Sequence, residues 1–290
     1  MFEAVKDILK EEKEKKSIFW KVVMENDCRE NGYDQKESWE KMHYIYGAMR
    51  ESEKSYSKDM KSRAGLSGSA AYKLEAALEK ENLLLGDFIG STAVKALKIA
   101  ESNACMRKIV AAPTAGSCGV VSAVFLAAQE RLELSDEKMT EAMYVAAGIG
   151  GVIAARASLS GAAGGCQAEI GAASSMAAAG LAYLMGGNSK MIANAAALAM
   201  KNMLGLACDP VAGLVEVPCV KRNVSGAVNA VTSAQLALAG IKSAIPADEV
   251  FDAMNAIGRG MDSSIRETGN GGLAATLTGK KIKEKMKTLM

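Results

Sequence analysis

The chain has 290 residues, of which 49% are hydrophobic and 23% are charged, which is enough for one large domain or two small ones. Its 35 basic and 33 acidic residues nearly cancel, and only 5% of its residues are aromatic. Balanced charge and scarce aromatic side chains argue against nucleic-acid binding, which relies on basic surfaces and base stacking. The single histidine, His43, excludes a zinc site built from several histidines, and a content of only four prolines favours a mainly α fold.

The N-terminal region, residues 1–62, interleaves charges of both signs with apolar residues at helical spacing, such as Trp39, Met42 and Met49. This pattern predicts two or three amphipathic helices, which form either a solvated collar or a docking surface for another subunit. The first 16 residues are too charged for a secretory signal, so we expect a cytoplasmic protein.

The remaining region, residues 63–290, is rich in Ala, Gly, Ser and Met and is expected to form one helical catalytic domain with glycine-rich loops. Ser135 and Pro246 each precede acidic residues and an apolar run at helical spacing, which is typical of a helix start. A further helix is predicted from Asn188 to about Leu206. Strict alternation of apolar and polar residues, the mark of a half-buried strand, is rare.

One stretch, residues 170–189, carries no charge over about the length of a membrane span. It is only mildly apolar, however, and contains several Ser and Gly residues. We therefore expect a tightly packed helical core rather than a membrane bundle.

Cysteines in a cytoplasmic protein point to metal binding, catalysis or packing rather than disulfides. Cys166 follows a pair of glycines that is predicted to turn into a helix, where the helix N-terminus favours a thiolate. Cys208 and Cys219 bracket a segment with two prolines and a glycine, which predicts a loop that brings two thiols together. The residues alone leave two interpretations open: a metal or iron–sulfur site with an open position, or buried packing thiols. The other three, Cys28, Cys105 and Cys118, are interpreted as packing or loop residues.

Two further segments are suited to binding an anion. The first glycine loop, residues 112–119, reads Ala-Pro-Thr-Ala-Gly-Ser-Cys-Gly, and the second glycine loop, residues 268–272, reads Thr-Gly-Asn-Gly-Gly. Each is expected to precede a helix and to expose backbone N–H groups, which suits a carboxylate or a phosphate, although a plain tight turn is the alternative. Neither loop matches a nucleotide-binding fingerprint.

Taken together, four segments resemble a known family: residues 112–119, residues 201–219, Arg222-Asn223 and the run Arg-Glu-Thr-Gly-Asn at 266–270. They are similar to the alpha chain of iron–sulfur-dependent L-serine dehydratases, and the resemblance covers roughly residues 60–280. It implies that residues 63–290 carry a [4Fe–4S] cluster. The implied cluster ligands are Cys166, Cys208 and Cys219.

The resemblance also implies the reaction, in which L-serine is deaminated to pyruvate and ammonia. An iron of the cluster that lacks a cysteine acts as a Lewis acid for the departure of hydroxide. The family implies a partner as well, a beta chain that carries a histidine as candidate base, so His43 is interpreted as structural. No general base is assigned in this chain. The candidate substrate-binding residues are Thr114, Ser117, Asn270, Lys201, Arg222 and Arg266.

Two alternatives stay open from the sequence. A lyase of the same fold would eliminate from L-threonine or L-cysteine, which a panel of substrates would show. A non-catalytic protein would instead use the three cysteines to hold a structural zinc, which iron and sulfide analysis would distinguish.

Overall fold

The computed structural model describes residues 2–80 and 84–288, and this part of the chain is mainly α, as predicted. Its helices, in chain order, are α1 (Val5–Lys15), α2 (Phe19–Asn31), α3 (Gln35–Lys54), α4 (Ala70–Leu78), α5 (Gly86–Ala104), α6 (Cys118–Leu132), α7 (Asp136–Arg156), α8 (Gly161–Gly164), α9 (Ala172–Leu184), α10 (Ser189–Lys201), α11 (Cys219–Leu238), α12 (Ala247–Gly260) and α13 (Leu277–Lys287). The described residues contain no strand, only one isolated β-bridge.

The N-terminal region forms three helices, α1 to α3, which confirms the predicted amphipathic helices. Their buried sides join the same hydrophobic core as the rest of the chain: Ile8, Trp20 and Met49 belong to one cluster with Phe125 and Ile149. The predicted boundary after residue 62 falls in the irregular segment between α3 and α4. The outer faces of these helices are charged. Docking of another subunit on these faces stays a prediction.

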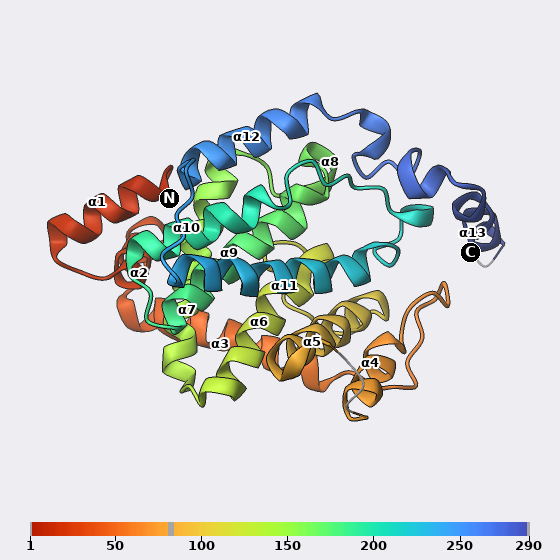
Figure 1. Ribbon diagram of the computed structural model, residues 1–290, viewed down its shortest axis with the longest axis horizontal. Helices are drawn as coiled ribbons and strands as arrows, with labels where there is room; N and C mark the ends of the chain where they lie inside the picture. Colours follow the sequence, from red (N-terminus) through yellow and green to blue (C-terminus); the bar gives the residue numbers. More distant parts are fainter. Residues whose placement is uncertain (1, 81–83, 289–290) are drawn as a thin grey trace.

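Helix α9 lies in the middle of the bundle and packs against α6, α7, α10 and α11 (Figure 1). Every side chain of α9 except that of Tyr183 is buried, because small Ala, Gly and Ser residues let the neighbouring helices approach closely. Its two serines donate hydrogen bonds to backbone carbonyls: Ser174 to Gly226 at 2.8 Å and Ser175 to Ala196 at 2.8 Å. Most of the uncharged stretch at 170–189 therefore lies in a buried core helix, which ends at Leu184 before an exposed turn. Over the described ranges, no helix combines the length and apolar character needed to cross a bilayer.

Gly180 of α9 shows how tight this packing is. A Cβ added at Gly180 would overlap Cζ of the buried Phe125 ring. We expect Gly180→Ala to lower the free energy of unfolding by about 1–3 kcal/mol, since the core would have to shift to accept the methyl group. Gly47 of α3 is a matched control with no atom within 4 Å of its added Cβ, so Gly47→Ala should raise stability by about 0.5–1 kcal/mol. Urea unfolding of both variants checks the pair, and equal effects would contradict this account of the packing.

The predicted helix starts are confirmed. The side chain of Ser135 caps α7 by accepting the Lys138 N–H at 3.3 Å, and Asn188 caps α10 by accepting the Lys190 N–H at 3.1 Å. The predicted end of α10 near Leu206 is wrong, because the helix ends at Lys201. The next residues turn, with Gly205 at a φ of 83°, and lead the chain directly to Cys208.

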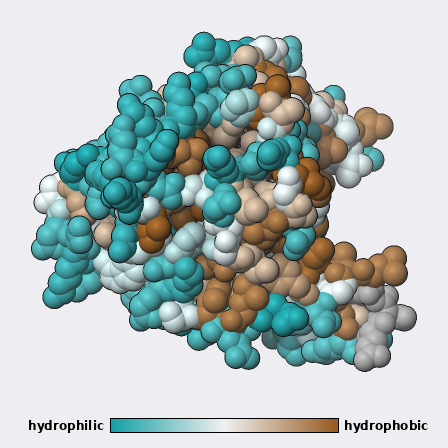
Figure 2. Space-filling view, turned by 60° about the vertical axis from the view of Figure 1, so that its left-hand side comes forward, coloured by the Kyte–Doolittle hydropathy of each residue, from teal (hydrophilic) through white to brown (hydrophobic). Residues whose placement is uncertain are grey.

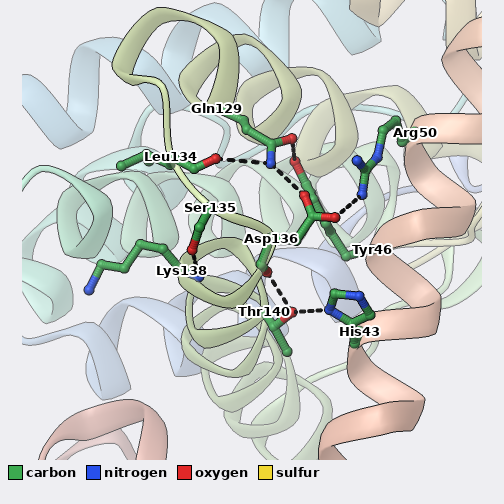
Figure 3. Close-up of polar contacts among 9 residues, drawn as sticks. All are labelled: His43, Tyr46, Arg50, Gln129, Leu134, Ser135, Asp136, Lys138 and Thr140. Atoms are coloured by element: carbon green, nitrogen blue, oxygen red, sulfur yellow. Dashed lines mark hydrogen bonds and ion pairs between the residues drawn. The ribbon is translucent and has the colours of Figure 1, made fainter.

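The single histidine lies in a polar network that holds α3 against the connection between α6 and α7 (Figure 3). His43 Nδ1 lies 3.1 Å from the Thr140 hydroxyl, which itself donates to the backbone carbonyl of Asp136. The Asp136 carboxylate accepts from Arg50 at 2.6 Å and from Gln129 at 2.8 Å. This arrangement agrees with a structural role for His43.

Hydrophobic side chains reach the surface on the right-hand side of Figure 2. The large hydrophobic residues with exposed side chains include Leu84, Leu85 and Met185. A pocket of about 280 Å³ also opens between α5, α6, α9 and α11, lined mainly by apolar side chains such as Phe88 and Leu238. Exposed apolar surface of this kind is typical of a protein that contacts a partner.

Candidate active site

The three cysteines that the sequence singles out come from three separate segments. Cys166 precedes a π-helical turn, η2 (Gln167–Gly171), which continues into α9. Cys208 lies in the irregular segment after α10, and Cys219 is the first residue of α11. The three side chains are buried, with exposed fractions of 2%, 3% and 8% in that order. The predicted entry of the chain into a helix at Cys166 is confirmed, and wide π turns are frequent at functional sites.

The segment from Cys208 to Cys219 folds back on itself, as predicted. The Val211 N–H donates to the Val217 carbonyl at 2.8 Å, which closes a loop around the short turn η3 (Val211–Gly213). Cys208 is also paired with a third segment, because its N–H donates to the Ile265 carbonyl at 2.8 Å and its carbonyl accepts the Glu267 N–H at 2.7 Å. The residues just before the second glycine loop are thereby held beside Cys208.

The three thiols are close enough to influence one another. Burial raises the pKa of Cys166 to about 11, although the Arg222 guanidinium acts against this shift. Burial also raises the pKa of Cys219 to about 12, and it raises the pKa of Cys208 well above its usual range, with the charge of Cys166 adding to both shifts. At Cys166, burial therefore raises the pKa by more than the helix N-terminus, which was expected to favour a thiolate, lowers it. The side chains of the described residues include no set of three His, Cys, Asp or Glu that converges as ligands of a single ion do.

Arg222 connects all three cysteine segments. It stands one turn after Cys219 on α11, and it donates to the Ala207 carbonyl at 2.6 Å and to the Asp209 carboxylate at 2.9 Å. Its guanidinium also lies near the Cys166 thiol, as the pKa of that thiol shows. These contacts engage Arg222 with the protein itself, so its predicted role as a charge partner of the substrate stays a prediction.

Two carboxylates that were not predicted as site residues lie beside Cys208. The Cys208 thiol donates to the Glu169 carboxylate over 3.9 Å. A Cβ added at Gly161 of α8 would lie 2.8 Å from Cys208 Sγ, 2.9 Å from Glu169 Oε2 and 3.3 Å from Glu267 Oε2. The side chains of Cys208, Glu169 and Glu267 therefore all approach Gly161, where any residue larger than glycine would overlap them.

The first glycine loop approaches the same place. Thr114 and Ser117 form a capping box around the short turn η1 (Ala115–Ser117), with 3.1 Å between their hydroxyls. A Cβ added at Gly116 would lie 3.2 Å from Glu169 Oε1. Burial raises the pKa of Glu169, and a hydrogen bond from Thr114 opposes that shift. The structure thus brings Thr114 to the cysteine site, whereas Ser117 is fully buried and bonded to Thr114.

Asn223 fixes the first glycine loop to α11. Its side-chain amide donates to the Gly116 carbonyl at 2.8 Å and to the Cys219 carbonyl at 2.9 Å, and its oxygen accepts the Gly119 N–H at 2.9 Å. This buried amide was part of the family pattern, but the sequence did not indicate that it would join the loop to a cysteine.

The second glycine loop leads into a short 3-10 turn, η5 (Gly272–Ala275). The backbone N–H of Leu273 in this turn donates to the Asp209 carboxylate at 2.9 Å, so a carboxylate of the chain itself lies where an anion was expected. Arg266 lies next to this loop, and its Nε is buried without a hydrogen-bond partner among the described residues. Asn270 is exposed, and Lys201 ends α10; within the described ranges no hydrogen bond joins either of them to the cysteine site.

Comparison with known proteins adds a second line of support. The sequence pattern of the serine dehydratase alpha chain family matches residues 11–274. The chain is 44% identical over 286 residues to the probable L-serine dehydratase alpha chain of Bacillus subtilis, a match that covers 99% of this chain and 95% of that protein. It is 48% identical over 200 residues to the L-serine dehydratase alpha chain of Peptoniphilus asaccharolyticus, which covers 69% of this chain and 68% of that protein.

A longer relative, the L-serine dehydratase of Helicobacter pylori, is 46% identical over 201 residues. This match covers 68% of the present chain but only 44% of the relative. More than half of that protein therefore lies outside the matched region.

Proposed function

Because this chain belongs to the serine dehydratase alpha chain family, we propose that it is the alpha subunit of an L-serine dehydratase, which forms pyruvate and ammonia from L-serine. The observation that carries the proposal is the burial of three cysteines on three segments that Arg222 joins.

The donor set fits the [4Fe–4S] cluster that we propose for Cys166, Cys208 and Cys219. Burial raises the pKa of all three thiols, so their binding as thiolates would draw on the positive charge that iron supplies. A cluster binds its thiolates on different irons, so its ligands need not converge on one point. A structural zinc would instead gather its ligands around one ion, and iron and sulfide analysis distinguishes the two. When bound, the cluster supplies an iron without a thiolate, which can act as a Lewis acid toward the serine hydroxyl.

The chain's own residues would bind and orient the substrate. The buried Nε of Arg266 lacks a hydrogen-bond partner among the described residues, and a guanidinium matches a carboxylate with two parallel hydrogen bonds. We therefore propose that Arg266 binds the substrate carboxylate. Thr114 adds a hydroxyl beside Glu169.

We propose that a partner chain, the beta chain, supplies the base that removes the α-proton. His43 is held in the network between α3 and α7, so the only imidazole of this chain is engaged elsewhere. The longer Helicobacter pylori relative supports a second component, because this chain matches less than half of it. A cytoplasmic enzyme of two different subunits is the resulting proposal.

Reconstitution tests the two-chain enzyme. We expect the cluster-loaded alpha chain to form pyruvate from L-serine at least about 100-fold more slowly alone than with a beta chain, because a positioned base contributes roughly that factor or more. The assay is pyruvate release under anaerobic conditions. Full activity of the alpha chain alone would contradict the shared site.

L-threonine and L-cysteine are the alternative substrates, and both carry a leaving group on the same carbon as L-serine. The names of the relatives favour L-serine. The same assay with the three amino acids, compared by kcat/KM, decides among them.

A further inference from the structure

Glu169 and Glu267 form a pair of carboxylates beside Cys208 that lacks a positive partner. Oε2 of Glu169 and Oε2 of Glu267 lie 2.9 Å and 3.3 Å from the same point, the position of a Cβ added at Gly161, so the two carboxylates stand close to each other. No Lys or Arg of the described ranges forms an ion pair with either carboxylate. Their oxygens lie on the same side of the chain, around the position that a side chain at Gly161 would take.

These carboxylates belong to a built site rather than to a loose acidic patch. The thiols of Cys166, Cys208 and Cys219 are each more than nine-tenths buried, and that of Cys208 lies against the same Gly161 position. Arg222 of α11 joins the segment of Cys219 to that of Cys208 and lies near Cys166, which places the carboxylate pair at the cysteine site where we propose the cluster.

The local backbone is arranged to keep both carboxylates there. Glu267 adopts a φ of 64°, a left-handed conformation that costs free energy for a residue with a side chain. The hydrogen bond from its N–H to the Cys208 carbonyl, at 2.7 Å, holds it in this conformation. Glu169 is enclosed between Gly116 and Gly161, where side chains would exclude it.

We propose that Glu169 and Glu267 bind the α-ammonium group of the substrate. This inference rests on the proposed function, because L-serine brings an ammonium group, a carboxylate and a hydroxyl to the site together. An ammonium group has three donors and can form short, charge-assisted hydrogen bonds to two carboxylates at once. With the substrate carboxylate on Arg266, the pair orients the α-carbon and selects amino acids over hydroxy acids of the same length.

The test compares two unreactive ligands that differ in this group. L-alanine carries the ammonium group, L-lactate has a hydroxyl in its place, and neither has the β-hydroxyl that is eliminated. Their dissociation constants are measured by equilibrium dialysis on the cluster-loaded complex of alpha and beta chains. The main variant is Glu267→Gln, because Glu267 is exposed and its loss is tolerated best, and Glu169→Gln is the second. Glu40→Gln on the outer side of α3 is the matched surface control.

We expect Glu267→Gln to weaken L-alanine binding about 10- to 100-fold, the range for a hydrogen bond to a charged group, and to change L-lactate binding less than about twofold. The KM for L-serine should rise in parallel, while iron per chain and the control stay at the wild-type level. Equal shifts for both ligands, no shift for either, or loss of iron in Glu267→Gln would overturn the assignment.

The same data separate this inference from the proposed function. A wild-type complex that forms pyruvate, paired with a Glu267→Gln variant that still binds L-alanine normally, refutes only the ammonium assignment. A wild-type complex that neither converts L-serine nor binds L-alanine refutes the proposed function, and the assignment with it.

Discussion

Replacement of Cys208 by serine is expected to reduce bound iron from about four atoms per chain to nearly none and to lower pyruvate formation by more than about 100-fold. Cys208 is buried and paired with the segment before the second glycine loop. Burial raises its pKa, and the charges of both other cysteines add to that shift. The substitution would remove one of the three ligands of the proposed cluster. Anaerobic iron and sulfide analysis with a visible spectrum measures the first effect, and the reconstituted assay measures the second.

Cys105→Ser is the matched control for this experiment. Cys105 follows α5 and is only half-buried, and within the described ranges no hydrogen bond joins it to the three proposed ligands, so its replacement should keep both iron and activity. Far-ultraviolet circular dichroism of both variants checks that the helices persist. Four irons in Cys208→Ser, or equal iron loss in the two variants, would argue against the assignment of Cys208 as a ligand.

Arg222→Met is expected to lower the free energy of unfolding of the iron-free chain by about 3–5 kcal/mol, as removal of one partner from a buried ion pair does. The side chains of Arg222 and Asp209 are only 17% and 7% exposed, so the change would leave the Asp209 carboxylate buried without its cation. The Ala207 carbonyl would lose its 2.6 Å hydrogen bond at the same time. Guanidinium chloride unfolding of the iron-free protein measures the effect.

Arg29→Met provides the comparison on the surface. Arg29 pairs with Glu11 at 3.2 Å, but its side chain is 57% exposed, so the same substitution should cost less than about 1 kcal/mol. Arg222→Lys keeps the positive charge but lacks the planar guanidinium group. Its loss of unfolding free energy should fall between those of Arg222→Met and Arg29→Met. If Arg222→Met were no more destabilising than Arg29→Met, Arg222 would not be what holds the cysteine segments together.

Local rules in the sequence predicted the helices well. Ser135 and Asn188 mark helix starts because their side chains can accept the free N–H groups of a first turn, and the structure shows these bonds. The loop from Cys208 to Cys219 was equally predictable from its prolines and glycine. The early end of α10 was missed because Asn202 to Gly205 lies within an otherwise helical pattern.

The candidate site was only partly predictable. The cysteines stood out by their sequence context and by the family pattern, but no local signal joins Glu169 to Glu267, which are far apart in the chain. Their meeting depends on the bridge between Cys208 and the segment before the second glycine loop. The π turn that presents Glu169 also has no distinct periodicity in the sequence, and the contact of Asp209 with the second glycine loop arises only from tertiary folding.

The two sides of the cysteine site differ in how firmly the protein holds them. The turn with Cys166 continues into α9, the buried central helix, so moving it means disrupting the core. Cys208 lies in an irregular segment that is attached through hydrogen bonds, among them the bridge to residues 265–267, the contacts of Arg222 and the bond from the Gln167 N–H to the Leu206 carbonyl. Irregular segments open locally at lower free energy than the whole molecule unfolds. A bulky inorganic group could therefore enter through local opening of the Cys208 segment, without unfolding of α9 and the turn that carries Cys166.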